Sequence, residues 1–231
     1  MKTQQLVHNL EAVRHQITEL EKKYHRNPND VCLIAVSKTH GIEAVRSIAA
    51  QGQFHFGENY VQEAIDKITN ITDMALVWHF IGPIQKNKTK LIASHFNWVH
   101  SIDRESVAIR LNKQRPTNLP VLNVCIQVNI DSEDSKSGVA PAEVLPLAQS
   151  IQSLTHLKLR GLMAIPSATS DFEKQLSAFQ KMSDLLDVLV QEGLDVDTLS
   201  MGMSGDYEAA IASGATMLRI GTAIFGRRSD S

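Results

Sequence analysis

Short apolar segments alternate with segments of helical pattern along almost the whole chain. A continuous apolar run such as Val31 to Val36 is typical of a strand covered on both faces. The strands predicted in this way are residues 31–36, 54–56, 76–81, 98–101, 121–128, 157–162, 198–201 and 217–220. The helices predicted between them are residues 42–50, 60–68, 86–94, 104–113, 141–151, 172–191 and 206–212.

The number of strand–helix units is the strongest guide to the fold. Each helix carries the chain back to begin the next strand parallel to the last, through a right-handed crossover. Eight such strands in 231 residues match the size of a (β/α)8 barrel, the TIM-barrel fold. An open, doubly wound α/β sheet stays open as the alternative, because periodicity does not separate the two.

An additional helix is predicted ahead of the first strand. Apolar residues recur three and four positions apart there and form one stripe: Leu6, Leu10, Val13, Ile17 and Leu20. Asn27-Pro28 ends this pattern. We expect the helix, within residues 1–27, to plug or flank a barrel spanning residues 31–226. No linker rich in Pro, Gly or Ser divides the chain, so one domain over residues 1–231 is the simplest interpretation.

Charge and composition narrow the function classes. Lys plus Arg number 23 and Asp plus Glu 25, a net charge of -2 with 5% aromatic residues, which argues against a nucleic-acid binder. No apolar run approaches the ~20 residues that span a bilayer, and no secretion signal follows Met1, so we expect a cytoplasmic protein without membrane contact. Cys32 and Cys125 lie in apolar strands and are expected to be buried free thiols. Metal-ligand spacings such as His-x-His are absent, so no metal site is expected.

Lys38 is the most informative polar residue at a strand end. It shares the parity of Ile34 and Val36, so it continues one face of the first strand instead of starting a solvated loop. A lysine with reduced hydration more readily becomes a neutral amine, and the neutral amine can form a Schiff base. A solvated strand-end lysine is the alternative.

Two segments near the C-terminus predict a phosphate site. Ser204-Gly205 follows the seventh strand and precedes a helix, and Gly221-Thr222 follows the eighth strand. Barrels often bind phosphate with the loops after these two strands, which lie next to the first strand in a closed ring. An ordinary helix cap is the alternative role of Ser204. A Schiff-base lysine beside a phosphate site is what pyridoxal 5'-phosphate requires.

Seven segments together resemble one known family. They are residues 33–39, 56–63, 79–82 with 85–88, 134–138, 160–163, 199–204 and 218–222. Their sequences and order are similar to the pyridoxal phosphate homeostasis proteins of the YggS/PROSC type, a family similar to the N-terminal barrel of alanine racemase. The resemblance therefore favours the barrel over the open sheet and implies pyridoxal 5'-phosphate as the cofactor.

The resemblance also implies roles for individual residues. It implies a covalent aldimine of the cofactor on Lys38. It places Arg219 near the pyridine nitrogen, with a phosphate or carboxylate partner as the alternative. The residues implied to hold the phosphate are Ser204, Gly205, Gly221 and Thr222.

Other residues are weaker candidates for the same site. Asn59 and His79 lie at the ends of the second and third strands and are candidates to line the ring, or are satisfied polar residues at strand ends. Met201 is expected beneath the cofactor or in the core. Lys136 is a candidate second amine for the cofactor, although a solvated loop lysine explains it as well.

The predicted function is a carrier of pyridoxal phosphate that binds, buffers and delivers it, as a monomer and without turnover. An Arg cannot give the ring nitrogen the protonation that carbanion chemistry needs. Because the sequence ends at Ser231, we expect no second domain to supply the opposing acid or base of a racemase. Apo forms of cofactor-dependent enzymes are the expected recipients. An amino-acid racemase, or a sugar-phosphate aldolase that uses Lys38 without a cofactor, are the alternatives.

Overall fold

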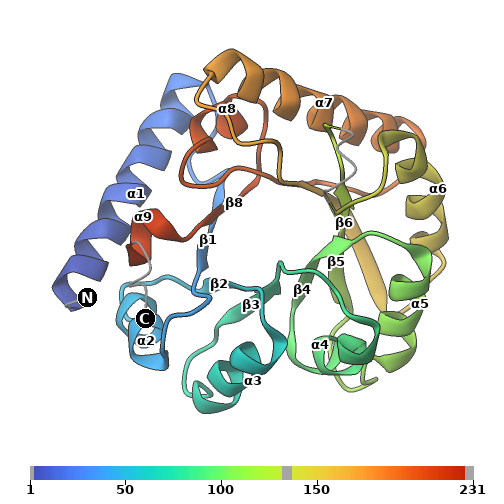
Figure 1. The fold of residues 1–231 in the computed structure, drawn as a ribbon, viewed down its shortest axis with the longest axis horizontal. Coiled ribbons are helices and arrows are strands. Elements are labelled where there is room, and N and C mark those ends of the chain that lie inside the picture. Colours follow the sequence, from blue (N-terminus) through green and yellow to red (C-terminus); the bar gives the residue numbers. More distant parts are fainter. Residues whose placement is uncertain (1–2, 132–136, 227–231) are drawn as a thin grey trace.

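Eight parallel strands close into a barrel in the computed structural model, which describes residues 3–131 and 137–226. Their order around the ring follows the sequence, and the last strand pairs with the first (Figure 1). The strands are β1 (Cys32–Val36), β2 (His55–Glu58), β3 (Val77–Phe80), β4 (Trp98–Ile102), β5 (Leu122–Val128), β6 (Leu157–Ala164), β7 (Thr198–Ser200) and β8 (Met217–Ile220). The predicted barrel is confirmed, and the open sheet is excluded by the β1–β8 pairing.

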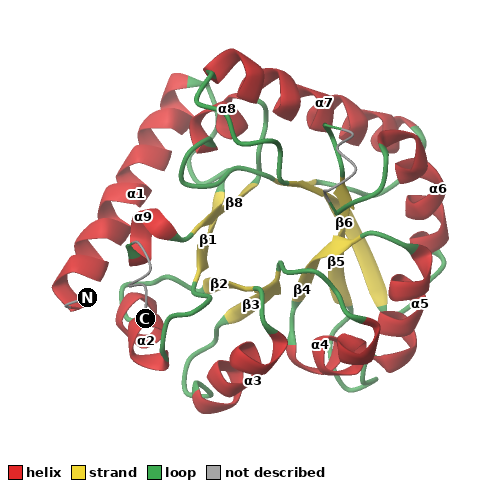
Figure 2. Cartoon of the chain, in the orientation of Figure 1, coloured by secondary structure: helices red, strands yellow, loops and turns green. Residues whose placement is uncertain are grey.

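Helices surround the barrel on its outer face (Figure 2). They are α1 (Thr3–Lys23), α2 (Ile42–Ala49), α3 (Val61–Asn70), the 3-10 turn η1 (Lys86–Lys88), α4 (Thr89–His95), α5 (Glu105–Gln114), α6 (Pro141–Gln152), α7 (Phe172–Gln191), α8 (Tyr207–Ala212) and α9 (Thr222–Phe225). The predicted helices agree with these within a few residues. Helix α9 was not predicted, because four residues are too few to show a helical period.

Helix α1 flanks the barrel and does not plug it. It lies along the outside, against α2, α8 and α9 (Figure 1). Four residues of its apolar stripe are buried and Leu20 is partly buried, and the Asn9 side chain donates to the Ile224 carbonyl of α9 at 2.9 Å. Of the two expected placements, flanking is therefore correct.

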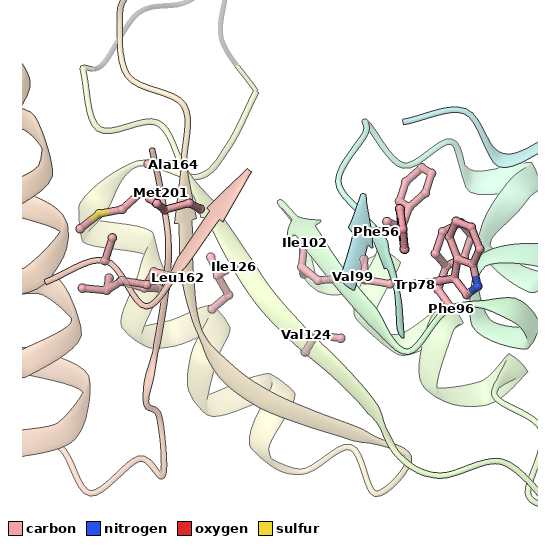
Figure 3. Packing of buried hydrophobic residues seen from close by; sticks show 14 of the residues in the cluster. Phe56, Trp78, Phe96, Val99, Ile102, Val124, Ile126, Leu162, Ala164 and Met201 are labelled. Atoms are coloured by element: carbon pink, nitrogen blue, oxygen red, sulfur yellow. The ribbon is translucent and has the colours of Figure 1, made fainter. Parts of the chain in front are cut away.

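The alternation of side chains along each strand separates an inner from an outer layer. The inner cluster joins residues of β8 and β1 with residues of β4, β5 and β6, which lie elsewhere in the ring, so its members meet inside the barrel: Ile34, Trp98, Cys125, Met163 and Met217. The outer layer packs the strands against the helices, and Figure 3 shows Phe56, Val99, Leu162 and Met201 within it. Because the inner face also carries polar residues, the barrel interior is the natural place to look for a site.

Two predictions from the sequence concern the state of the cysteines and the absence of a membrane-spanning helix. Cys125 is fully buried and Cys32 partly so, and both are free thiols. Burial raises the pKa of the Cys125 thiol to about 12. Within residues 3–131 and 137–226, none of the helices has the length and apolar character that crossing a bilayer requires.

Candidate functional site

Lys38 stands at the carboxyl end of the barrel, two residues beyond β1, and is half-buried. Ile34, which shares its parity in the sequence, lies in the inner cluster, so the first strand has the facing that the parity argument for Lys38 assumes. The neighbouring strands are β2 and β8. A Cβ built at Gly221, directly after β8, would lie 3.4 Å from the Val36 carbonyl oxygen. The backbone after β8 therefore passes close to the strand end that carries Lys38.

The backbone on both sides of Lys38 is fixed by charged side chains of α3. Nζ of Lys67 donates to the Ser37 carbonyl oxygen at 2.7 Å. Oε1 of Glu63 accepts from the Thr39 backbone N–H at 2.6 Å. Thr39 adopts φ of 66°, a left-handed conformation that is unfavourable for a β-branched residue. These bonds hold the turn that places Lys38 at the mouth.

Lys67 is the centre of a buried ion cluster. Its Nζ lies 2.6 Å from carboxylate oxygens of both Glu58 and Glu63, and the Lys67 side chain is 2% exposed. Glu58 is fully buried; its Oε1 also accepts from Ser37 Oγ at 2.6 Å, and among the described residues its Oε2 has no partner. Burial raises the pKa of the Glu58 carboxyl, although the Lys67 ammonium opposes this shift. The cluster links the end of β1, the end of β2 and helix α3 next to the turn that contains Lys38.

The two predicted phosphate segments meet in space. Ser204 Oγ accepts from the backbone N–H of Ala223, at the start of α9, at 3.3 Å. The residue that precedes α8 is Asp206, whose carboxylate accepts from the Met203 N–H at 2.6 Å. Ser204 is therefore not the cap of α8, which was its alternative role. Its hydroxyl instead joins the loop after β7 to the loop after β8.

The remaining predicted phosphate residues lie on the same two loops. Gly205 and Thr222 are exposed, and Gly221 is partly exposed. Backbone N–H groups of loop glycines and a threonine hydroxyl are donors of the kind that bind phosphate in barrels. A cavity of about 590 Å³ borders Ser204 and Gly205 on the side of α1 and α7. Lys38 and Arg219 are not among the residues lining that cavity, so it adjoins the loop from outside the mouth.

Gly202 shapes the loop that carries Ser204. Its φ is 95°, a left-handed conformation. A Cβ built there would lie 2.7 Å from both Ala210 Cβ and Leu218 Cδ2. Any residue other than glycine would therefore force this loop away from α8 and β8.

Arg219 lies inside the barrel below Lys38. It pairs in register with Ile34 on β1 and is 4% exposed. Its Nη1 donates to Ser200 Oγ at 2.8 Å and its Nη2 to the Ala164 carbonyl oxygen at 2.9 Å. Burial lowers the pKa of Arg219 to about 10, so the guanidinium stays charged at neutral pH. The predicted residue is thus a fixed cation beneath the mouth.

The weaker candidates lie in different places. Asn59 is half-buried directly after β2, and its buried Oδ1 has no partner among the described residues. His79 lies deeper in the barrel, fully buried, with both ring nitrogens 2.9 Å from nitrogens of His55 and His100. Its alternative role, a polar residue whose hydrogen bonds are satisfied within the protein, therefore fits better than direct lining of the cofactor ring.

Met201 belongs to the outer hydrophobic layer, which favours its predicted place in the core over a place beneath the cofactor. Lys136 lies outside the described residues.

Sequence reasoning missed two groups of residues around this site. One is the Glu58–Glu63–Lys67 cluster, for which the spacing of Glu63 and Lys67, four apart on a helix, was an available signal. The other is a set of histidines in the barrel interior, described below. No sequence signal marks that set, because its members come from separate strands.

Known proteins similar to this chain share one family. Residues 8–229 match the family model described as alanine racemase, N-terminal domain. The pyridoxal phosphate homeostasis protein of Vibrio cholerae is 51% identical over 227 residues, covering 96% of each chain. That of Escherichia coli K12 is 49% identical over 229 residues, covering 98% of each.

Solved structures give the same picture. PipY of Synechococcus elongatus, in a structure with PLP bound, has 35% identity and a TM-score of 0.84, covering 96% of this chain and 100% of that one. Alanine racemase of Corynebacterium glutamicum has 19% identity and a TM-score of 0.67, covering 96% of this chain and 62% of the racemase, and shares the fold. The chain therefore belongs to the family of pyridoxal phosphate homeostasis proteins, within the alanine racemase N-terminal domain family.

Proposed function

We propose that the chain binds pyridoxal 5'-phosphate through a Schiff base on Lys38 and serves to buffer and deliver it. The observation that carries the proposal is the meeting of the loops after β7 and β8, through Ser204, beside the strand end that bears Lys38. Relatives about 50% identical are named pyridoxal phosphate homeostasis proteins, and the PipY structure contains PLP.

The residues present suit this cofactor. Its phosphate requires several donors, and Ser204, Gly205, Gly221 and Thr222 supply hydroxyl and backbone N–H groups. Its ring nitrogen is an acceptor, and Arg219 is a buried donor with five N–H groups, two of which make the contacts given above. The buried Oδ1 of Asn59 is an acceptor without a protein partner among the described residues, available to a ligand hydroxyl or a bound water.

Lys38 would supply the amine for the covalent bond. Its neutral amine would add to the aldehyde carbon, and the C=N bond would form as the two amine protons leave with the carbonyl oxygen as water. The bonds made by Lys67 and Glu63 to the neighbouring residues hold the backbone on both sides of Lys38, so the turn that carries the amine is formed before the cofactor binds. When bound, the cofactor can stabilise negative charge on a substrate carbon.

We also propose that binding here is not coupled to turnover. Arg219 presents positive N–H groups and cannot deliver the proton that a carboxylate partner would hold at the ring nitrogen. The site is therefore suited to binding the cofactor reversibly and not to stabilising a carbanion. The chain is expected to act as a monomer, which light scattering after size-exclusion chromatography tests, and to pass the cofactor to apo forms of enzymes that need it.

The test of this proposal is spectroscopic titration followed by transfer. Adding pyridoxal phosphate to the protein should produce a visible absorption band in the wild type and in the exposed-lysine control Lys181→Ala, but not in Lys38→Ala. The loaded protein should then activate an apo-enzyme. A band of equal strength in Lys38→Ala, or a loaded protein that never yields its cofactor, would contradict the proposal.

An amino-acid racemase is the competing function, and the shared barrel alone speaks for it. Solvent deuterium should enter the α-carbon of an amino acid if the loaded protein is a racemase. No deuterium incorporation across a panel of amino acids is expected for a carrier.

A further inference from the structure

Three histidines and one serine form a continuous hydrogen-bonded column through the barrel. Nδ1 of His55 lies 2.9 Å from Nε2 of His79, and Nδ1 of His79 lies 2.9 Å from Nε2 of His100. Nδ1 of His100 lies 2.7 Å from Oγ of Ser200. The four residues come from β2, β3, β4 and β7, so the column crosses the barrel interior from one wall to another.

The two ends of the column differ. At one end, Ser200 Oγ accepts from Nη1 of Arg219 at 2.8 Å, beneath the mouth of the barrel. At the other end, His55 is partly exposed and lines a cavity of about 370 Å³, together with residues of α1 and the start of β1. The column therefore connects the floor of the candidate cofactor site with a cavity at the opposite end of the barrel.

The histidines of the column are neutral. Burial lowers the pKa of His79 well below its usual value, with repulsion from His100 and His55 adding to the effect. Burial, with repulsion from Arg219, lowers the pKa of His100 to about 3, and burial also lowers the pKa of His55.

Charged groups outside the column act on Arg219 and lie near the rings. Asp206 interacts electrostatically with Arg219, and the Arg160 guanidinium lies 4.9 Å from the Trp98 ring centroid and interacts with the Cys125 thiol. His79 stacks on Trp98 with 19° between the ring planes, which fixes its orientation. Within the described residues, no group of three or more His, Cys, Asp or Glu side chains can hold a metal ion.

Ser200 gives the column a direction. A hydroxyl has one proton to donate and two lone pairs, and Arg219 is always a donor. If Nδ1 of His100 carried a proton, Ser200 would accept twice, and its own proton would find no acceptor among the contacts of the described residues. If Ser200 donates to Nδ1 of His100, every group is satisfied.

This direction passes along the whole chain of rings. A neutral imidazole donates at one nitrogen and accepts at the other. His100 therefore carries its proton on Nε2 and donates to Nδ1 of His79. His79 in turn donates from Nε2 to Nδ1 of His55, and His55 keeps its proton on Nε2, the nitrogen that does not face the column.

We propose that this column of hydrogen bonds runs in one direction and positions Arg219. The arginine donates to Ser200, so Ser200 donates to His100 and all three histidines adopt the Nε2–H tautomer. The column in turn holds the guanidinium beneath the cofactor site. His100 and Ser200 are positioning residues in this arrangement. A change in the hydrogen bonding of Arg219 then changes the tautomer of His55, at the other end of the barrel. The consequence for the cofactor rests on the proposed function, whereas the tautomers do not.

The test is 15N–1H NMR of the cofactor-free full chain labelled with 15N-histidine, because correlations to ring protons separate the protonated from the bare nitrogen. In the wild type at neutral pH, His55, His79 and His100 should all be neutral Nε2–H tautomers. An Nδ1–H tautomer or a charged ring at any of the three would overturn the proposal. This measurement needs no variant and no cofactor.

Two variants test the origin of the direction. Ser200→Ala and Arg219→Met should each introduce Nδ1–H signals at His100 and at His79. Two matched controls lie outside the column. Ser101→Ala removes a buried serine hydroxyl, and Arg160→Met removes a nearby cation that is not hydrogen-bonded to any residue of the column. Unchanged tautomers in both Ser200→Ala and Arg219→Met, or equal changes in the controls, would refute the coupling.

A cofactor arm tests the consequence for binding. The Ser200→Ala variant loses one charge-assisted hydrogen bond to Arg219. Its dissociation constant for pyridoxal phosphate should therefore be about 10-fold higher than that of Ser101→Ala. Failure of the wild type to bind would refute the proposed function and leave the tautomer result standing. Equal binding by both variants would refute the positioning role.

Discussion

Replacing Lys67 by Met should cost more stability than any surface substitution of a lysine. The side chain is 2% exposed, and its Nζ makes bonds of 2.6 to 2.7 Å to Glu58, Glu63 and the Ser37 carbonyl oxygen. Methionine has a similar volume, so little cavity forms. What remains is the Glu58 carboxylate, fully buried and without its cation.

The expected loss follows from the uncompensated charge. Breaking a buried ion pair by removing one partner costs about 3–5 kcal/mol. For a chain of this size, that corresponds to a melting temperature lowered by roughly 6–20 °C. Because burial raises the pKa of Glu58, the carboxyl lowers stability most when it is ionised, so the deficit should grow as pH rises through its folded pKa and shrink in acid.

Urea denaturation followed by circular dichroism measures this loss. Lys181→Met, at an exposed position on α7, should change the free energy of unfolding by less than about 0.5 kcal/mol. The double variant Lys67→Met/Glu58→Gln should recover part of the loss, because the buried charge is gone. A deficit below about 1 kcal/mol in Lys67→Met, or no recovery in the double variant, would refute the reasoning about the buried charge.

Three further outcomes follow from the structure. Gly202→Ala should destabilise the chain by roughly 2–4 kcal/mol in urea unfolding, through left-handed strain and the clash of its Cβ. Ser204→Ala should weaken pyridoxal phosphate binding about 10-fold in a spectroscopic titration, whereas Ser153→Ala on the surface should not. Because His100 is protonated more readily when unfolded, it should contribute a fall in stability of about 1.4 kcal/mol per pH unit as pH drops below ~6.5, so the slope of stability against pH, from urea unfolding at two pH values, should be smaller by about this amount in His100→Gln.

Most of the architecture is visible in the sequence. The apolar runs located all eight strands, and the period of two along β1 correctly assigned Ile34 to the inner face. The face on which Lys38 lies stays a prediction. The position of α1 was left open between plugging and flanking, because its single apolar stripe is equally consistent with either. The closed barrel was predicted from the strand count, but the choice against an open sheet, and the close approach of Gly221 to Val36, required the structure.

Interactions between distant strands could not be predicted in the same way. His100 and Ser200 are one hundred residues apart, and their contact depends on the register of strands across the barrel. His79 looked like a strand-end residue, but the structure shows a ring enclosed one layer below, with both nitrogens used. Met201 has the opposite parity to Ser200 and therefore belongs to the outer layer, an inference that the alternation of β7 already permitted.

The central claim is that Lys38 carries the cofactor. Borohydride reduction of the protein loaded with pyridoxal phosphate, followed by peptide mass analysis, tests it most directly, because reduction makes the bond to the lysine permanent. We predict that the peptide containing Lys38 gains the mass of the reduced adduct and that this adduct is lost in Lys38→Ala. An adduct confined to other lysines, with the Lys38 peptide unmodified, would contradict the account.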